Sequence, residues 1–158
     1  MPYFMKKTLC FIATLGPIGF APAPGTAGSL AALIAGWFIA SQGYLVLALA
    51  SLAALLIGII AAETYSQMSN TKDASEVIID EVAGQWVVLL CIPPLIEGAL
   101  LWYIVAFILF RFFDITKIGP VGMAEKLGGG IGIMADDIVA GGLAGMCVLA
   151  LQFAIYSL

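Results

Sequence analysis

Two pairs of adjacent carboxylates are the strongest candidates for chemistry in this chain of 158 residues. One pair opens the segment Asp80-Glu-Val-Ala-Gly84, and the other opens Asp136-Asp-Ile-Val-Ala-Gly141. Each pair precedes an apolar run, so we expect both at helix starts, with a nearby glycine that lets another helix or a ligand approach closely. A single acid would be enough to cap a helix and complement its dipole.

Four carboxylates that converge near an apolar boundary would repel one another and lose hydration. A divalent cation with oxygen ligands would relieve both effects. The sequence therefore predicts a metal site formed by Asp80, Glu81, Asp136 and Asp137.

A second charged group consists of Arg111, Asp114 and Lys117, which are spaced so that they share one face of a helix ending nearby. One interpretation is an intrahelical salt bridge that anchors the helix at a membrane surface. The other is phosphate binding, in which Arg111 offers a planar fork of donors, Lys117 a point charge and Asp114 a further metal ligand. The spacing leaves both interpretations open.

Glycine-rich segments flank these charged groups. Pro24-Gly-Thr-Ala-Gly-Ser29 runs into the first apolar helix, where Thr26 or Ser29 could cap the helix and bind phosphate together with exposed backbone N–H groups. An ordinary turn followed by a cap gives the same pattern, and no Gly-Lys-Ser/Thr of a Walker A loop follows. We expect Gly128–Gly132 to form a loop, either flexing over a ligand or simply turning.

The composition indicates that apolar membrane helices position these groups. The chain is 63% hydrophobic and 10% charged, far from the roughly 45–50% and 25% of soluble domains. We therefore predict an all-α, polytopic membrane bundle of about five helices in a single domain, residues 1–158. The apolar runs cover residues 29–40, 44–62, 82–95, 100–113 and 138–156. Gly141 and Gly145 predict close helix packing, within the chain or across a homodimer.

All six basic residues fall on one side of the predicted bundle. By the positive-inside rule that side is cytoplasmic, and the turns near Gln42 and Glu97 lie outside. The polar segments share the basic side, which predicts active-site loops at the cytoplasmic face. The N-terminus resembles a signal peptide, but Gly16-Pro17 breaks its apolar run, so we expect a membrane-surface or partly inserted segment instead.

Several functions are excluded by what the composition lacks. The chain contains no histidine, which removes histidine-dependent hydrolase and zinc chemistry. Its three cysteines lie singly in apolar stretches and are read as buried hydrophobes. No basic stripe mixed with aromatic residues indicates nucleic-acid binding.

Taken in order, four motifs resemble the phosphatidylglycerophosphatase A family. They are Pro24-Gly-Thr-Ala-Gly-Ser29, Asp80-Glu-Val-Ala-Gly84, Phe110-Arg-Phe-Phe-Asp114 with Lys117 and Pro120, and Gly132-Ile-Met-Ala-Asp-Asp-Ile-Val-Ala-Gly141. The resemblance implies a Mg²⁺-dependent lipid phosphatase of the bacterial inner membrane. Such an enzyme hydrolyses phosphatidylglycerophosphate to phosphatidylglycerol and inorganic phosphate. The chain departs from the family pattern at Ile118-Gly119, which does not touch a predicted ligand.

On this interpretation the carboxylates hold Mg²⁺ and a water attacks phosphorus, with an aspartyl phosphate as the alternative. Thr26, Ser29, Arg111 and Lys117 then bind the substrate phosphate. A cation channel or transporter is the rival function, because intramembrane acids also mark ion paths. Glu97 is the lone acid in the outer half, which argues against a path across the membrane. The spaced signature of CDP-alcohol phosphotransferases is absent.

Overall fold

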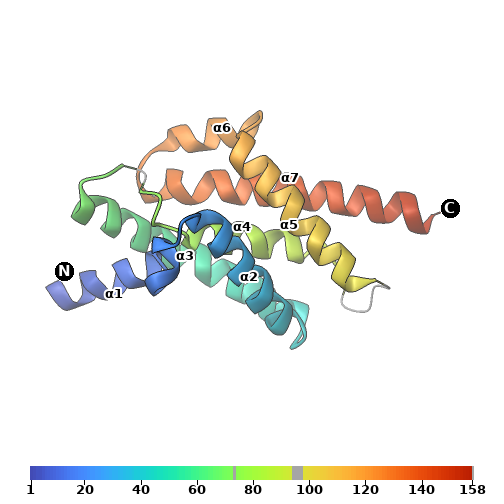
Figure 1. The fold of residues 1–158 in the computed structure, drawn as a ribbon, viewed down its shortest axis with the longest axis horizontal. Helices are drawn as coiled ribbons and strands as arrows, with labels where there is room; N and C mark the ends of the chain where they lie inside the picture. Colours follow the sequence, from blue (N-terminus) through green and yellow to red (C-terminus); the bar gives the residue numbers. More distant parts are fainter. Residues whose placement is uncertain (73, 94–97, 158) are drawn as a thin grey trace.

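The described part of the chain is helical throughout. The structure is a computed structural model that describes residues 1–72, 74–93 and 98–157, and within these ranges it contains no strand. Figure 1 shows the helices in chain order. They are α1 (Tyr3–Ala13), η1 (Gly16–Phe20), α2 (Pro24–Ala40), α3 (Tyr44–Ser69), α4 (Ile79–Leu89), α5 (Ala99–Thr116), α6 (Pro120–Ala124), η2 (Glu125–Leu127) and α7 (Gly129–Tyr156). The predicted outer turn at Glu97 lies outside the described residues.

Three of these helices, α3, α5 and α7, are long and apolar enough to cross a membrane by length and composition. Helix α2 is also apolar but has 17 residues. Large apolar side chains such as Phe38, Leu45 and Phe153 are exposed on their outer faces, and Phe153 is 75% exposed. Such a surface suits lipid rather than water. The predicted membrane helix bundle is confirmed.

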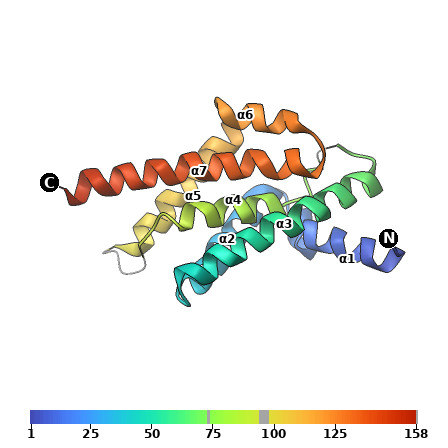
Figure 2. The same ribbon diagram turned by 180° about the vertical axis from the view of Figure 1, so that it is seen from behind.

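Helix α4 is the centre of the bundle rather than one of its outer walls. It packs against α2, α3, α5 and α7, and it lies between α3 and α7 in both Figures 1 and 2. Most of its residues are buried, although it has only 11 of them. The prediction of a membrane helix over residues 82–95 is therefore wrong in extent. Pro93 follows soon after Leu89, and a proline restricts the backbone before it and cannot continue a helix.

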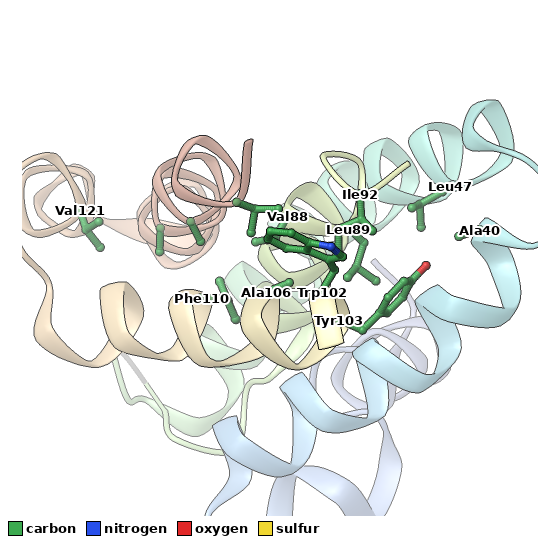
Figure 3. Packing of buried hydrophobic residues seen from close by; sticks show 13 residues of the cluster. Ala40, Leu47, Val88, Leu89, Ile92, Trp102, Tyr103, Ala106, Phe110 and Val121 are labelled. Atoms are coloured by element: carbon green, nitrogen blue, oxygen red, sulfur yellow. The ribbon is translucent and has the colours of Figure 1, made fainter. Parts of the chain in front are cut away.

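A hydrophobic cluster holds the C-terminal half of α4 in place. Val88 and Leu89 of α4 pack with Trp102 and Phe110 of α5, as Figure 3 shows. Trp102 also donates a hydrogen bond from Nε1 to the hydroxyl of Tyr156 at 3.3 Å, which ties α5 to the end of α7. The packed core thus fixes the position of the N-terminal end of α4, where Asp80 and Glu81 lie.

The two ends of the bundle differ in character. In Figures 1 and 2, α1, the end of α3, η2 and the start of α7 lie at one end, and the turn from α2 to α3 and the C-terminus lie at the other. The lysines on α1, after α3 and on η2 are therefore at the same end, as the sequence predicts. They are Lys6, Lys7, Lys72 and Lys126.

Three helix boundaries differ from the prediction. Helix α7 begins at Gly129, so all of the predicted loop Gly128–Gly132 except Gly128 is helical, and Asp136 and Asp137 lie two turns inside the helix rather than at its start. Helix α3 continues to Ser69, where Asn70 in the left-handed conformation ends it. Helix α2 begins at Pro24, a favoured first residue, so neither Thr26 nor Ser29 caps it.

Candidate active site

A charged cavity of about 480 Å³ opens at the N-terminal end of α4. Its walls come from the start of α4, the end of α5, η2, the first turns of α7 and the segment after α3. Six carboxylates and three lysines line it. They are Asp80, Glu81, Asp114, Glu125, Asp136, Asp137, Lys72, Lys117 and Lys126. All five acids predicted to be catalytic are among them, and the excess of carboxylates makes the cavity attractive to cations.

Close packing of α4 against α7 brings the two acidic motifs together. A β-carbon on Gly141 would collide with the carbonyl oxygen of Gly84, and one on Gly84 would lie 2.5 Å from the carbonyl oxygen of Asp137. A β-carbon on Gly145 would lie 2.7 Å from the side-chain sulfur of Cys91. The predicted packing role of these glycines is thus confirmed within one chain, and it lets backbones touch just below the acids.

Three of the four predicted metal ligands converge. Asp80, Glu81 and Asp137 each present an oxygen that lies within 4.8 Å of the other two. Glu81 Oε2 and Asp137 Oδ2 are buried and accept no hydrogen bond. Buried carboxylate oxygens without partners are unfavourable, and a hard divalent cation such as Mg²⁺ accepts just such ligands. The residues present therefore fit the predicted metal.

Asp136 lies apart from these three ligands and faces Lys117. Its Oδ2 accepts a hydrogen bond from Lys117 Nζ, which also lies 3.8 Å from Glu125 Oε1. Burial alone would lower the pKa of Lys117, but the hydrogen bond and charge of Asp136, with Glu125 and Asp114, raise it above its ordinary value. Lys117 is therefore a fixed positive charge on the cavity wall, and Asp136 holds it there.

Arg111 forms a second paired cation. Its Nη1 lies 2.5 Å from Asp114 Oδ2 and 3.6 Å from Glu81 Oε1. The predicted intrahelical pair between Arg111 and Asp114 thus exists, and it extends to the acidic cluster through Glu81. Arg111 does not line the cavity; it lies behind Glu81, where Gly25 of α2 leaves room for both side chains.

Comparison with known proteins decides the family. The model of the phosphatidylglycerophosphatase A family matches residues 11–152. The chain belongs to the phosphatidylglycerophosphatase A family. It is 37% identical over 134 residues to phosphatidylglycerophosphatase A of Haemophilus influenzae, covering 84% of this chain and 80% of that protein. The Escherichia coli protein of the same name is 30% identical over 119 residues, covering 75% of this chain and 67% of its own length.

A third relative carries a different name. A candidate phosphatidylinositol-3-phosphatase of Bacteroides thetaiotaomicron is 41% identical over 130 residues, covering 78% of this chain and 80% of that protein. No solved structure matches the chain. Membership of the phosphatidylglycerophosphatase A family confirms the resemblance and makes the chain a lipid phosphatase.

Within this phosphatidylglycerophosphatase A fold, the two hydroxyl residues predicted to bind phosphate do not reach the cavity. Ser29 is fully buried; its Oγ donates to the carbonyl of Gly25 at 2.8 Å and accepts a hydrogen bond from Arg111 Nη1 at 3.3 Å. Thr26 is exposed and does not line the cavity. The geometry gives Ser29 a positioning role toward Arg111.

Ser29→Ala is expected to lower kcat about tenfold with little change in KM, because Arg111 loses one partner and Glu81 loses its support. Thr26→Ala is the matched control and should change neither constant by more than about twofold. Steady-state phosphate release by both variants measures this. A rise in KM for Thr26→Ala alone would instead restore Thr26 as a phosphate ligand.

Sequence reasoning missed three residues of the site. Lys72 and Lys126 line the cavity, although they served only to predict topology. Glu63 of α3 accepts a hydrogen bond on Oε2 from the N–H of Gly130 at 2.7 Å and so fixes the first turn of α7. For Glu63, the signal in the sequence was the glycine-rich run, because closely packed backbone often needs a side-chain acceptor for its N–H groups.

Proposed function

We propose that this chain hydrolyses phosphatidylglycerophosphate to phosphatidylglycerol and inorganic phosphate with Mg²⁺, as a step of bacterial phospholipid synthesis. The observation that supports this most strongly is the convergence of Asp80, Glu81 and Asp137, with two unpartnered buried oxygens, in the charged cavity of a lipid phosphatase. The names of the two phosphatidylglycerophosphatase A relatives supply the substrate.

In this proposal Asp80, Glu81 and Asp137 hold the metal, and Asp114 and Asp136 complete the acidic wall. Bound Mg²⁺ supplies the positive charge that a phosphate needs in a carboxylate-lined cavity and makes a water more acidic. The chain's own groups do the positioning. Lys117 presents its charge to the cavity while Asp136 holds its Nζ, and Arg111 braces Glu81 from behind.

The cavity lies at the lysine-bearing end of the bundle, which by the positive-inside rule faces the cytoplasm. We place it at the cytoplasmic surface of the inner membrane. Only the head group then has to enter the cavity, while the acyl chains stay in lipid beside the exposed apolar faces.

Phosphate release from phosphatidylglycerophosphate by the purified protein in neutral detergent tests the function. We expect release with Mg²⁺, loss of release in excess chelator, and recovery when Mg²⁺ is restored. Release that is unaffected by chelator would remove the metal from the proposal. Absence of release with metal, from a protein that is folded by circular dichroism, would remove the substrate.

The Bacteroides relative gives a reason to test a second substrate. Phosphatidylinositol 3-phosphate also carries a terminal phosphate monoester, so it should be assayed beside phosphatidylglycerophosphate at equal concentration. We expect the larger kcat/KM for phosphatidylglycerophosphate. The opposite order would assign the chain to phosphoinositides while leaving its class of chemistry unchanged.

A further inference from the structure

Two lysines at the cavity differ from the other cations of the site in how they are paired within the described residues. Arg111 is paired with Asp114 and Glu81, and Lys117 is paired with Asp136 and Glu125. Lys72 and Lys126 line the same cavity, and neither makes an ion pair with any residue in the described ranges. No carboxylate in the described part of the chain therefore neutralises their positive charges, which can meet a ligand.

The cavity thus has a buried acidic floor and an exposed basic rim. Asp137 on the floor is 3% exposed, whereas Lys72 and Lys126 are both exposed. The two lysines come from different segments, one after α3 and one on η2, which both lie beside the start of α7 at one end of the bundle (Figures 1 and 2). A ligand that fills the cavity therefore extends from two lysine ammonium groups to a cluster of carboxylates.

This division matches a ligand that has two different phosphates. We infer that Lys72 and Lys126 bind the phosphodiester of the lipid substrate while its terminal phosphomonoester meets the metal that the carboxylate floor would hold. The inference rests on the proposed function. A phosphodiester has two non-bridging oxygens that share one negative charge, and each oxygen can accept a hydrogen bond from a flexible ammonium group. A cavity of about 480 Å³ is within the size range of pockets that enclose ligands as large as this head group.

The same chemistry could come from another source, since a neighbouring anionic lipid in the membrane also presents a phosphodiester. If the substrate's own diester is bound, the two lysines contribute to specificity. They then favour lipids with both a diester and a terminal phosphate over lipids that have the terminal phosphate alone.

The test uses a short-chain phosphatidylglycerophosphate that stays monomeric, so that no charged lipid surface is present. The combined variant Lys72→Gln, Lys126→Gln is expected to raise KM about tenfold or more, with kcat within about twofold of wild type. The two products separate the subsites as inhibitors. Short-chain phosphatidylglycerol, which has only the diester, should lose affinity by a similar factor, whereas inorganic phosphate should not.

Two further variants serve as controls. Lys6→Gln, Lys7→Gln removes the same charge from α1, outside the cavity, and should leave KM unchanged. Lys72→Arg, Lys126→Arg keeps the charge and should restore most of the affinity. An unchanged KM in the glutamine variant would overturn the inference, as would equal losses for both inhibitors. An effect seen only in anionic vesicles would assign the lysines to neighbouring lipids and would also overturn it.

These results are distinguishable from failure of the proposed function. If wild-type protein releases no phosphate from phosphatidylglycerophosphate, the proposed function and the inference fall together. If wild type is active and the glutamine variant has wild-type constants, the inference alone falls.

Discussion

Asp137→Asn is expected to lower kcat for phosphate release about a thousandfold while the bundle stays folded. Asp137 is buried in α7, contributes one of three converging oxygens and has an unpartnered Oδ2. Asparagine keeps the volume but removes the charge that would hold the metal, a loss on the order of 4 kcal/mol in the transition state. Steady-state kinetics over a series of Mg²⁺ concentrations, with thermal unfolding of both proteins, measures the effect.

Glu125→Gln is the matched control for this change. It removes the same charge from the same cavity, but the Glu125 side chain is 48% exposed on η2 and lies outside the three-carboxylate cluster. We expect its kcat to stay within about threefold of wild type. If both variants lose activity equally, the charge of the cavity rather than the cluster governs catalysis, and the assignment of Asp137 as a metal ligand is wrong.

Asp136→Asn separates the site predicted from sequence from the site that the structure shows. The sequence treats Asp136 and Asp137 as equivalent ligands, whereas only Asp137 joins Asp80 and Glu81. We expect Asp136→Asn to lower kcat about tenfold to a hundredfold, because Lys117 loses its partner, with no change in the Mg²⁺ concentration that gives half-maximal rate. An equal shift in Mg²⁺ requirement for both variants would support the four-carboxylate site instead.

The architecture could be predicted because hydropathy is a local property. Apolar runs can be read directly from the sequence, and the first turn of α4 was predicted because Asp80-Glu81 directly precedes one, although α4 is too short to span a bilayer. The ordered motifs then indicated the family, which the comparisons confirm.

The start of α7 could not be predicted because tertiary contacts set it. Glycine has a low helix propensity, so Gly128–Gly132 favours a loop when considered alone. In the folded chain Glu63 binds the N–H of Gly130, and the absence of a side chain there lets α7 lie against the carbonyl of Ile59. This extension places Asp136 and Asp137 two turns inside the helix. There Asp136 contacts Lys117, whereas Asp137 joins the other two acids of the carboxylate cluster.

The partner of Ser29 was also beyond the sequence. Its position beside a helix start and two glycines is typical of a phosphate loop, yet its hydroxyl binds Arg111, which is 82 residues away in the chain. Long-range side-chain pairs leave no periodic signal, so a motif can mark the site correctly while its residues act on one another rather than on the ligand.

Gly141→Ala is expected to lower the free energy of unfolding by about 2–3 kcal/mol and kcat about a hundredfold, although Gly141 does not line the cavity. The added methyl group would collide with the carbonyl oxygen of Gly84, which is rigid backbone, so α4 and α7 must move apart. Asp80 and Glu81 lie on α4 and Asp137 on α7, so this movement opens the carboxylate cluster. Thermal unfolding and phosphate release measure the two effects.

Gly142→Ala is the neighbouring control. A β-carbon at Gly142 meets no atom within 4 Å, and the residue lies in the interior of α7 with an ordinary helical backbone. Alanine there should preserve activity and stabilise the protein by up to about 1 kcal/mol, because it favours a helix more than glycine does. Equal losses in the two variants would mean that α7 tolerates no change of glycine along this stretch. If Gly141→Ala kept full activity, the two helices would have accommodated the methyl group without moving the acids. The spacing of α4 and α7 would then not control the carboxylate cluster.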